Sequence, residues 1–126
     1  HWHSLYDSAY LVHLAAMPDV RIVGLQDPSE KIAAHRAAQL GKPPTFTDYR
    51  KMLDETRPDF VIALGRHRVM PEIAHYLLDA GYPFVMEKPI GLDASQVRSV
   101  AEKATAKGGF VAPVDNSPQS SNHFVP

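Results

Sequence analysis

Three short stretches of the chain combine residue types that can bind a ligand or move a proton. Asp27 offers a carboxylate, which accepts hydrogen bonds from hydroxyl groups. In Gly65-Arg66-His67, the glycine lets the backbone approach a ligand, and the histidine can carry a proton near neutral pH. In Glu87-Lys88-Pro89, a carboxylate adjoins an ammonium group that could hold a hydroxyl and assist proton movement during hydride transfer. The sequence therefore offers groups for hydroxyl recognition and for acid–base chemistry.

Each stretch also has a purely structural interpretation, which the residues alone do not exclude. Asp is a preferred N-cap, so Asp27 could serve only to begin a helix. His67 could lie in a solvated loop, and the Glu87-Lys88 pair could be an exposed ion pair, which stabilises a protein little. His1 and His3 could bind a metal, but no third ligand stands at a useful spacing, so we expect no metal site.

Helices and strands alternate along the chain, and they must position these residues. Apolar residues at helical spacing predict helices, and short apolar runs predict strands that are buried on both faces. The predicted helices cover 4–16, 28–40, 48–53, 71–80 and 94–107, and the predicted strands cover 20–25, 45–46, 60–64, 83–86 and 110–112.

Capping residues set the predicted boundaries of these helices. We expect Asp27 and Thr47 to be N-caps, and Gly41 and Gly81 to end helices in the left-handed conformation. A capping box of Asp93 and Gln96 should begin the last helix. The inward residues expected on that helix are Val97, Val100, Ala101 and Ala104.

The long connections between strands predict parallel pairing, because hairpin turns are absent. Right-handed crossovers then place helices on both faces, so we predict a doubly wound, Rossmann-like α/β fold. Ligands of such folds bind beyond the carboxyl ends of the strands, where all three stretches stand. A carboxylate at the position of Asp27 would accept hydrogen bonds from the adenosine ribose of a dinucleotide.

Composition excludes several other classes of protein. The chain has 126 residues and a net charge of −1, with no clustered basic face, so we expect no nucleic-acid partner. It contains no Cys, which excludes disulfides and thiolate chemistry. Neither a membrane-spanning run nor a signal-peptide pattern is present. We therefore expect a soluble, cytoplasmic protein without a membrane partner.

The segment Met86-Glu87-Lys88-Pro89-Ile90-Gly91 resembles the Glu-Lys-Pro motif of a known superfamily of oxidoreductases. This is the glucose–fructose oxidoreductase, inositol 2-dehydrogenase and rhizopine catabolism superfamily, abbreviated Gfo/Idh/MocA. The stretches 18–28, 45–49, 57–63 and 75–81 are similar to the same family. The likeness covers about residues 4–112, nearly the whole chain.

The resemblance implies an NAD- or NADP-dependent dehydrogenase that acts on a hydroxyl of a sugar, cyclitol or related polyol, and that forms a homo-oligomer at full length. Lys88 would be the catalytic residue, at the nicotinamide and the substrate hydroxyl. Asp27 would favour NAD, because a carboxylate repels a 2′-phosphate. The implied cofactor-binding residues are Asp27, Gly65, His67, Glu87, Lys88 and Pro89.

The chain departs from the family at both ends. The family's first strand and Gly-rich turn have no counterpart here, and neither has its second domain. We expect residues 1–112 to form a partial NAD(P)-binding domain that is inactive alone, and 113–126 to connect toward a second domain. One alternative is a non-catalytic dinucleotide- or ligand-binding regulatory domain of the same fold. A second is a response-regulator-like domain, but this sequence lacks the acidic cluster around a phosphorylatable Asp that such a domain needs, so it ranks last. The Glu87-Lys88 pair favours the enzyme.

Overall fold

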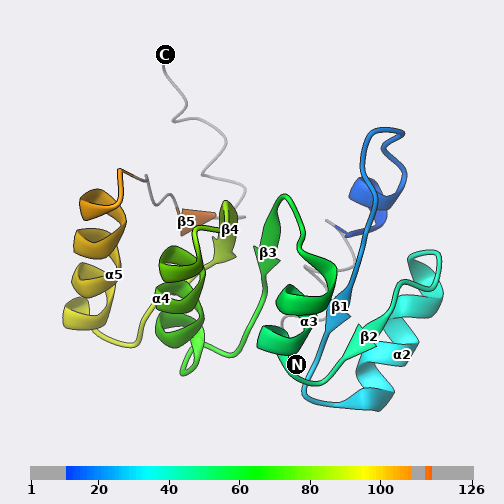
Figure 1. The fold of residues 1–126 in the computed structure, drawn as a ribbon. Helices are drawn as coiled ribbons and strands as arrows, with labels where there is room; N and C mark the ends of the chain where they lie inside the picture. The colour runs from blue at the N-terminus through cyan, green and yellow to red at the C-terminus, as the bar shows by residue number, and fades with distance from the viewer. Residues whose placement is uncertain (1–10, 109–112, 115–126) are drawn as a thin grey trace. The chain divides into compact units, whose positions relative to one another are not determined.

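The computed structural model describes residues 11–108 and 113–114 of the chain. The chain divides into two compact units, His1–Pro58 and Asp59–Pro126. In both units, parallel strands alternate with helices (Figure 1). The prediction of an α/β fold with parallel pairing is confirmed.

The first unit contains a two-stranded parallel sheet and the helices that cover it. Strand β1 (Leu25–Gln26) pairs with β2 (Thr45–Phe46), the strand predicted over 45–46. Helices α2 (Glu30–Gln39) and α3 (Tyr49–Thr56) both contact the two strands. Residues 11–15 are helical, in agreement with the prediction, whereas 4–10 lie outside the described residues.

A small hydrophobic cluster holds this unit together. Leu25, Ala33 and Leu40 are buried in it, and Leu11 and Ile22 pack against it. Leu25 is the buried residue of β1, Ala33 lies on α2, and Leu40 follows α2 directly. Because Ala33 and Leu40 are seven residues apart, they lie on one face of the helix and can both pack against β1.

The first predicted strand is wrong over most of its length. Residues 20–24 are not in a strand, and Val20 is exposed rather than buried. The reason is the shortness of the ladder with β2. Its flanking hydrogen bonds run from the Leu25 N–H to the Pro44 carbonyl and from the Asp27 N–H to the Phe46 carbonyl, at 3.0 and 3.1 Å. Residues 20–24 stand outside that ladder.

Helices α2 and α3 begin later than predicted. Ser29, not Asp27, is the N-cap of α2, and its hydroxyl accepts a hydrogen bond from the main chain of the first turn. Asp48, not Thr47, caps α3, which continues to Thr56 instead of ending at residue 53. In each case two adjacent or near-adjacent residues have similar capping preferences, and the one nearer the helix is used.

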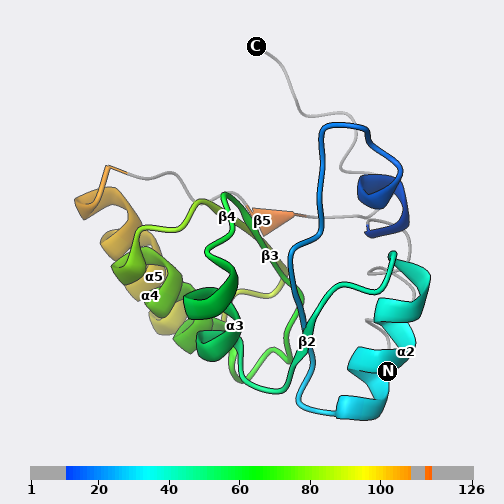
Figure 2. The same ribbon diagram turned by 45° about the vertical axis from the view of Figure 1, so that its right-hand side comes forward.

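The second unit contains a three-stranded parallel sheet with two helices. Its strands are β3 (Val61–Ala63), β4 (Phe84–Glu87) and β5 (Pro113–Val114), in that order. Helices α4 (Met70–Ala80) and α5 (Ala94–Ala106) lie side by side and contact each other (Figures 1 and 2). The predicted strand over 110–112 lies outside the described residues. Residues 113–114, predicted to be part of a connection, pair with β4.

The core of the second unit is built from the facing stripes of α4 and α5 and from the sheet. Met70, Ala74 and Leu77 are buried on α4, and Val100 and Ala104 on α5. Val97 and Ala101, which we expected to face inward, are exposed. The buried stripe of α5 is therefore a narrow one, in which the two buried residues are four positions apart.

Candidate functional site

The carboxyl ends of β3 and β4 bring together five of the six residues singled out in the sequence. The strands are in parallel register, with Val61 opposite Phe84 and Ala63 opposite Met86. The loop that follows β3 and the segment that follows β4 therefore leave the sheet at the same edge (Figure 1). This edge carries Gly65, His67, Glu87, Lys88 and Pro89.

Gly65 stands where the loop after β3 approaches its own helix closely. Its N–H donates a hydrogen bond to the sulfur of Met70, at 3.2 Å. A Cβ atom at this position would lie 2.9 Å from that sulfur and 3.3 Å from Cδ1 of Ile73. Packing against α4 therefore gives a structural reason for glycine here that is independent of any ligand.

His67 lies in the turn that leads into α4. The carbonyl of His67 accepts a hydrogen bond from the Met70 N–H at 3.4 Å, and the carbonyl of Arg66 accepts one from the Val69 N–H at 2.9 Å. His67 is half-buried, whereas Arg66 and Arg68 beside it are exposed. The turn is thus ordered by its own main chain, and of its three polar side chains the imidazole is the most buried.

Glu87 and Lys88 have opposite environments although they are adjacent. Glu87 is 5% exposed and is the one buried charged residue in the described part of the chain. Its Oε1 accepts a hydrogen bond from the Lys88 N–H at 3.1 Å. The Lys88 side chain is exposed at the end of β4. A buried carboxylate requires such partners, so the interpretation of the pair as an exposed ion pair is wrong for Glu87.

Asp27 belongs to the first unit, where it follows β1. It is half-buried, and its Oδ1 accepts a hydrogen bond from the Ser29 N–H at 2.8 Å. This bond forms a turn before α2 instead of the predicted N-cap. Within the described residues, the other carboxylate oxygen, Oδ2, has no hydrogen-bond partner. Asp27 therefore keeps one acceptor atom for a further group at the carboxyl end of a strand.

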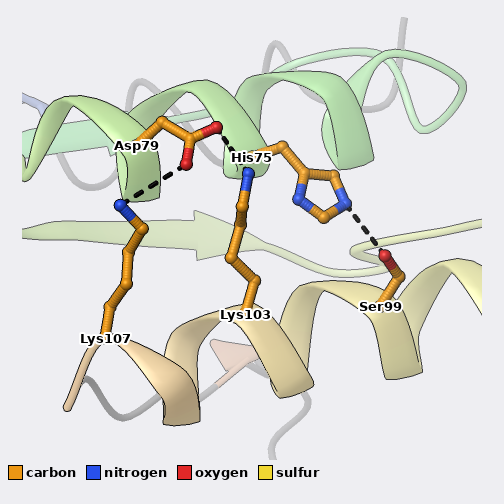
Figure 3. Close-up of polar contacts among 5 residues, drawn as sticks. All are labelled: His75, Asp79, Ser99, Lys103 and Lys107. Carbon is orange, nitrogen blue, oxygen red and sulfur yellow. Dashed lines mark hydrogen bonds and ion pairs between the residues drawn. The ribbon is translucent and has the colours of Figure 1, made fainter.

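A second set of polar contacts, between α4 and α5, was not foreseen from the sequence. Figure 3 shows that Lys103 and Lys107 on and after α5 reach Asp79 on α4, and that Ser99 reaches His75. The partners are 24 or more residues apart, so no local spacing could have indicated them. Asp79, Ser99 and Lys107 are exposed, whereas His75 and Lys103 are half-buried between the two helices.

The described residues contain no group of three or more His, Asp or Glu residues that could hold a metal ion, and His1 and His3 lie outside the described residues. No described helix has both the length and the apolar character needed to cross a membrane.

Parallel strands that alternate with helices define a Rossmann-like α/β fold, and comparison with known proteins bears out this fold. A family model described as "Oxidoreductase family, NAD-binding Rossmann fold" matches residues 5–114. The chain belongs to this family, Gfo/Idh/MocA, and the resemblance seen in the sequence is confirmed. A comparison with curated proteins gives no match.

Solved structures share the fold. The myo-inositol 2-dehydrogenase of Lactobacillus plantarum is 22% identical, with 92% of this chain and 36% of that one covered and a TM-score of 0.77. GenD2 from gentamicin A biosynthesis, solved with NAD, is 25% identical, with 82% and 30% covered and a TM-score of 0.71. A 3-ketoreductase from Actinomadura kijaniata, solved with NADP and TDP-benzene, is 21% identical, with 88% and 36% covered and a TM-score of 0.72. The chain spans about a third of the length of these proteins.

Proposed function

We propose that the protein is an NAD(P)-dependent dehydrogenase that acts on a hydroxyl group of a sugar, cyclitol or related polyol. The observation that carries the proposal is the pair at the end of β4, where buried Glu87 holds the main chain of exposed Lys88. Membership of the oxidoreductase family supports the reaction class. The names of two structural relatives, a myo-inositol 2-dehydrogenase and a 3-ketoreductase, support the substrate class.

The residues after the strands have the chemistry that a dinucleotide needs. We assign recognition of the adenosine ribose to Asp27, whose Oδ2 can accept hydrogen bonds from ribose hydroxyls. A carboxylate there repels the 2′-phosphate of NADP, so we expect NAD to be preferred. We assign the lining of the cofactor to the strand-end residues of the second unit, which are Gly65, His67, Glu87, Lys88 and Pro89.

Lys88 has the properties required of the acid–base residue. When bound, NAD would supply the hydride acceptor. The exposed ammonium of Lys88 would donate a hydrogen bond to the reacting hydroxyl oxygen. After it has lost a proton to solvent, the neutral amine would accept the hydroxyl proton as the hydride leaves. Glu87 would act through the main chain of Lys88, because its carboxylate is buried and bonded to that N–H. This hydrogen bond would fix the backbone of Lys88, and so the point from which its side chain reaches the substrate.

The proposal is tested with the full-length protein and a panel of polyols and sugars that includes myo-inositol and D-glucose. NAD or NADP is added, and formation of the reduced cofactor is followed by absorbance. We expect turnover with at least one polyol, and a higher kcat/KM with NAD than with NADP. Tight binding of NAD by calorimetry with no turnover on any member of the panel would instead favour the non-catalytic binding domain.

The role of Lys88 is tested by substitution. Lys88→Ala should lower kcat by roughly 10²–10⁴-fold, the range for one acid–base group. Lys88→Arg should not restore activity, because the guanidinium stays protonated and differs in shape. Lys31→Ala is the matched control, since Lys31 is exposed on α2. Normal turnover in Lys88→Ala would remove the catalytic assignment.

A further inference from the structure

The segment 88–92, here named the Lys88 loop, joins β4 to α5 and is held at both ends. At its start, the Lys88 N–H donates to Oε1 of Glu87 at 3.1 Å. At its end, the Leu92 N–H donates to Oε1 of Gln96 at 2.8 Å. Between the two bonds, Ile90 is buried, with 6% of its surface exposed. The loop that carries Lys88 is therefore fixed by two side chains and one apolar anchor.

The end of the loop lies directly against the first turn of α5. Gly91 is buried, and a Cβ atom there would lie 2.8 Å from Cβ of Gln96 and 3.3 Å from the Val97 nitrogen. Only a residue without a side chain allows this approach. The loop backbone and Gln96 are thus in contact as well as hydrogen-bonded.

Gln96 is itself held in place by the cap of α5. The Asp93 carboxylate accepts hydrogen bonds from the main chain of Ser95 and Gln96, at 2.8 and 3.0 Å, and from the Ser95 hydroxyl at 2.6 Å. These bonds, with the Ser95 hydroxyl first among them, hold the pKa of Asp93 below its ordinary value. The predicted capping box of Asp93 and Gln96 is therefore only half formed, because the Gln96 side chain accepts its hydrogen bond from the Leu92 N–H rather than from the N–H of the N-cap Asp93. Asp93 caps the helix, whereas the Gln96 side chain reaches one residue further back, to the loop.

We propose that Gln96 is a positioning residue for Lys88: its side-chain oxygen fixes the loop so that the Lys88 ammonium meets the reacting hydroxyl. The proposal rests on the catalytic role proposed above for Lys88. Loss of the acceptor at position 96 releases the Leu92 N–H and loosens one end of a five-residue loop. A displacement of about 1 Å in a reacting group is enough to cost roughly 10²-fold in rate.

The test compares three substitutions of Gln96 in the full-length protein. Gln96→Ala and Gln96→Met remove the acceptor, and Met keeps the side-chain length. Both should lower kcat about 10- to 100-fold, with the KM for NAD changed less than about twofold. Gln96→Glu keeps an oxygen acceptor and should retain activity within about threefold of the parent. The polyol that gives the highest turnover in the panel is the substrate.

A second readout is independent of turnover. Amide hydrogen exchange of Leu92, measured without cofactor or substrate, reports the bond to Gln96 directly. We expect faster exchange of this amide in Gln96→Ala and Gln96→Met, and parent-like exchange in Gln96→Glu. Unchanged exchange of the Leu92 amide in Gln96→Ala would overturn the proposal whatever the activity.

Ser95→Ala is the matched control. It removes a hydroxyl from the same turn of α5, and that hydroxyl bonds Asp93 rather than the loop. We expect near-normal kcat in Ser95→Ala. If kcat falls equally in Ser95→Ala and Gln96→Ala, the loss comes from general weakening of the helix cap, and the proposal is overturned. If Lys88→Ala is inactive and Gln96→Ala is normal, the role of Gln96 is wrong while the proposed function stands. If Lys88→Ala is normal, both fail.

Discussion

Lys103 on α5 donates a hydrogen bond from Nζ to the carboxylate of Asp79 on α4 and so connects the two helices of the second unit (Figure 3). Lys107 reaches the other oxygen of the same carboxylate at 3.4 Å. The hydrogen bond from Lys103, and then the weaker influence of Lys107, hold the pKa of Asp79 below its ordinary value. This relationship gives the stability of the protein a defined dependence on pH.

We predict that the Asp79 contribution to stability disappears in acid. The pKa of this group is lower in the folded protein than in the unfolded chain, so the folded state binds fewer protons between the two values. The contribution is complete above the unfolded pKa and is lost as the pH falls through the folded pKa. Asp79→Asn should lower the Tm at neutral pH, and the difference from the parent should shrink in acid.

Glu55→Gln provides the comparison for Asp79→Asn. Glu55 is paired with Lys51 at 3.8 Å within a single helix, and both side chains are more than half exposed. Because that pair connects no two elements, we expect a smaller change in Tm at neutral pH. If the difference in Tm between Asp79→Asn and the parent stays constant down to the lowest pH, the contribution of Asp79 to stability does not depend on its protonation, which contradicts the prediction.

Gly81 should be hard to replace because of its backbone conformation alone. It ends α4 with φ +76°, and a Cβ atom there would meet nothing within 4 Å. Gly81→Ala should therefore cost roughly 1–2 kcal/mol of unfolding free energy, the cost of the left-handed conformation without any clash. Gly41→Ala, at φ +80° and equally unobstructed, should cost a similar amount. Urea denaturation measures both, and a change near zero at either glycine would show that its φ is not positive in solution.

Leu77 is the strongest single test of the α4 core. Its exposure is 0%, whereas its neighbour Leu78 is only half-buried. Leu77→Ala should cost about 2–5 kcal/mol, because it removes buried methyl groups and leaves a cavity. Leu78→Ala, the control, should cost clearly less on the same denaturation curves. Equal costs would mean that the two leucines are buried alike.

Asp27→Asn separates ribose recognition from the local turn. Asn can still accept the hydrogen bond from the Ser29 N–H, so the Tm should change little. Loss of the negative charge should narrow the preference for NAD over NADP by roughly tenfold or more, since a hydrogen bond to a charged group contributes about 1.5–3 kcal/mol. The ratio of kcat/KM for the two cofactors measures this.

Asp48→Asn is the control for Asp27→Asn. Oδ1 of Asp48 likewise accepts a hydrogen bond from the main-chain N–H two residues on, that of Arg50, at 2.8 Å. Its substitution should leave the cofactor ratio at the parental value. If Asp27→Asn also leaves the NAD-to-NADP ratio of kcat/KM unchanged, Asp27 has no role in ribose recognition and only forms the turn before α2.

The parts of the fold that depend on local chemistry were predictable from the sequence. Gly41 and Gly81 end helices with positive φ because glycine has no Cβ penalty there. Thr45–Phe46 is a strand as predicted. The N-cap of α2 was misplaced because Asp27 and Ser29 are both good capping residues, and only the structure shows that Asp27 bonds Ser29 instead.

The environment of the site residues could not be predicted in the same way. A carboxylate is expected to be exposed, so nothing in the sequence indicated that Glu87 is buried and bonded to the Lys88 main chain. The close approach of Gly65 to Met70 is likewise a matter of tertiary packing. What the sequence did predict was the location: parallel strands place these residues at one edge, because their carboxyl ends coincide.

The contact between Gly65 and Met70 shields the Met70 sulfur from oxidants in solvent. The chain has no cysteine, so methionine sulfur is its most oxidisable atom type. Met17 is 51% exposed and accessible to peroxide, whereas Met70 is 1% exposed and its sulfur accepts a hydrogen bond from the Gly65 N–H. Oxidation of Met70 to the sulfoxide would replace a buried apolar side chain with a polar one. We therefore expect added peroxide to oxidise Met17 before Met70, because the Met70 sulfur becomes accessible only when the second unit opens.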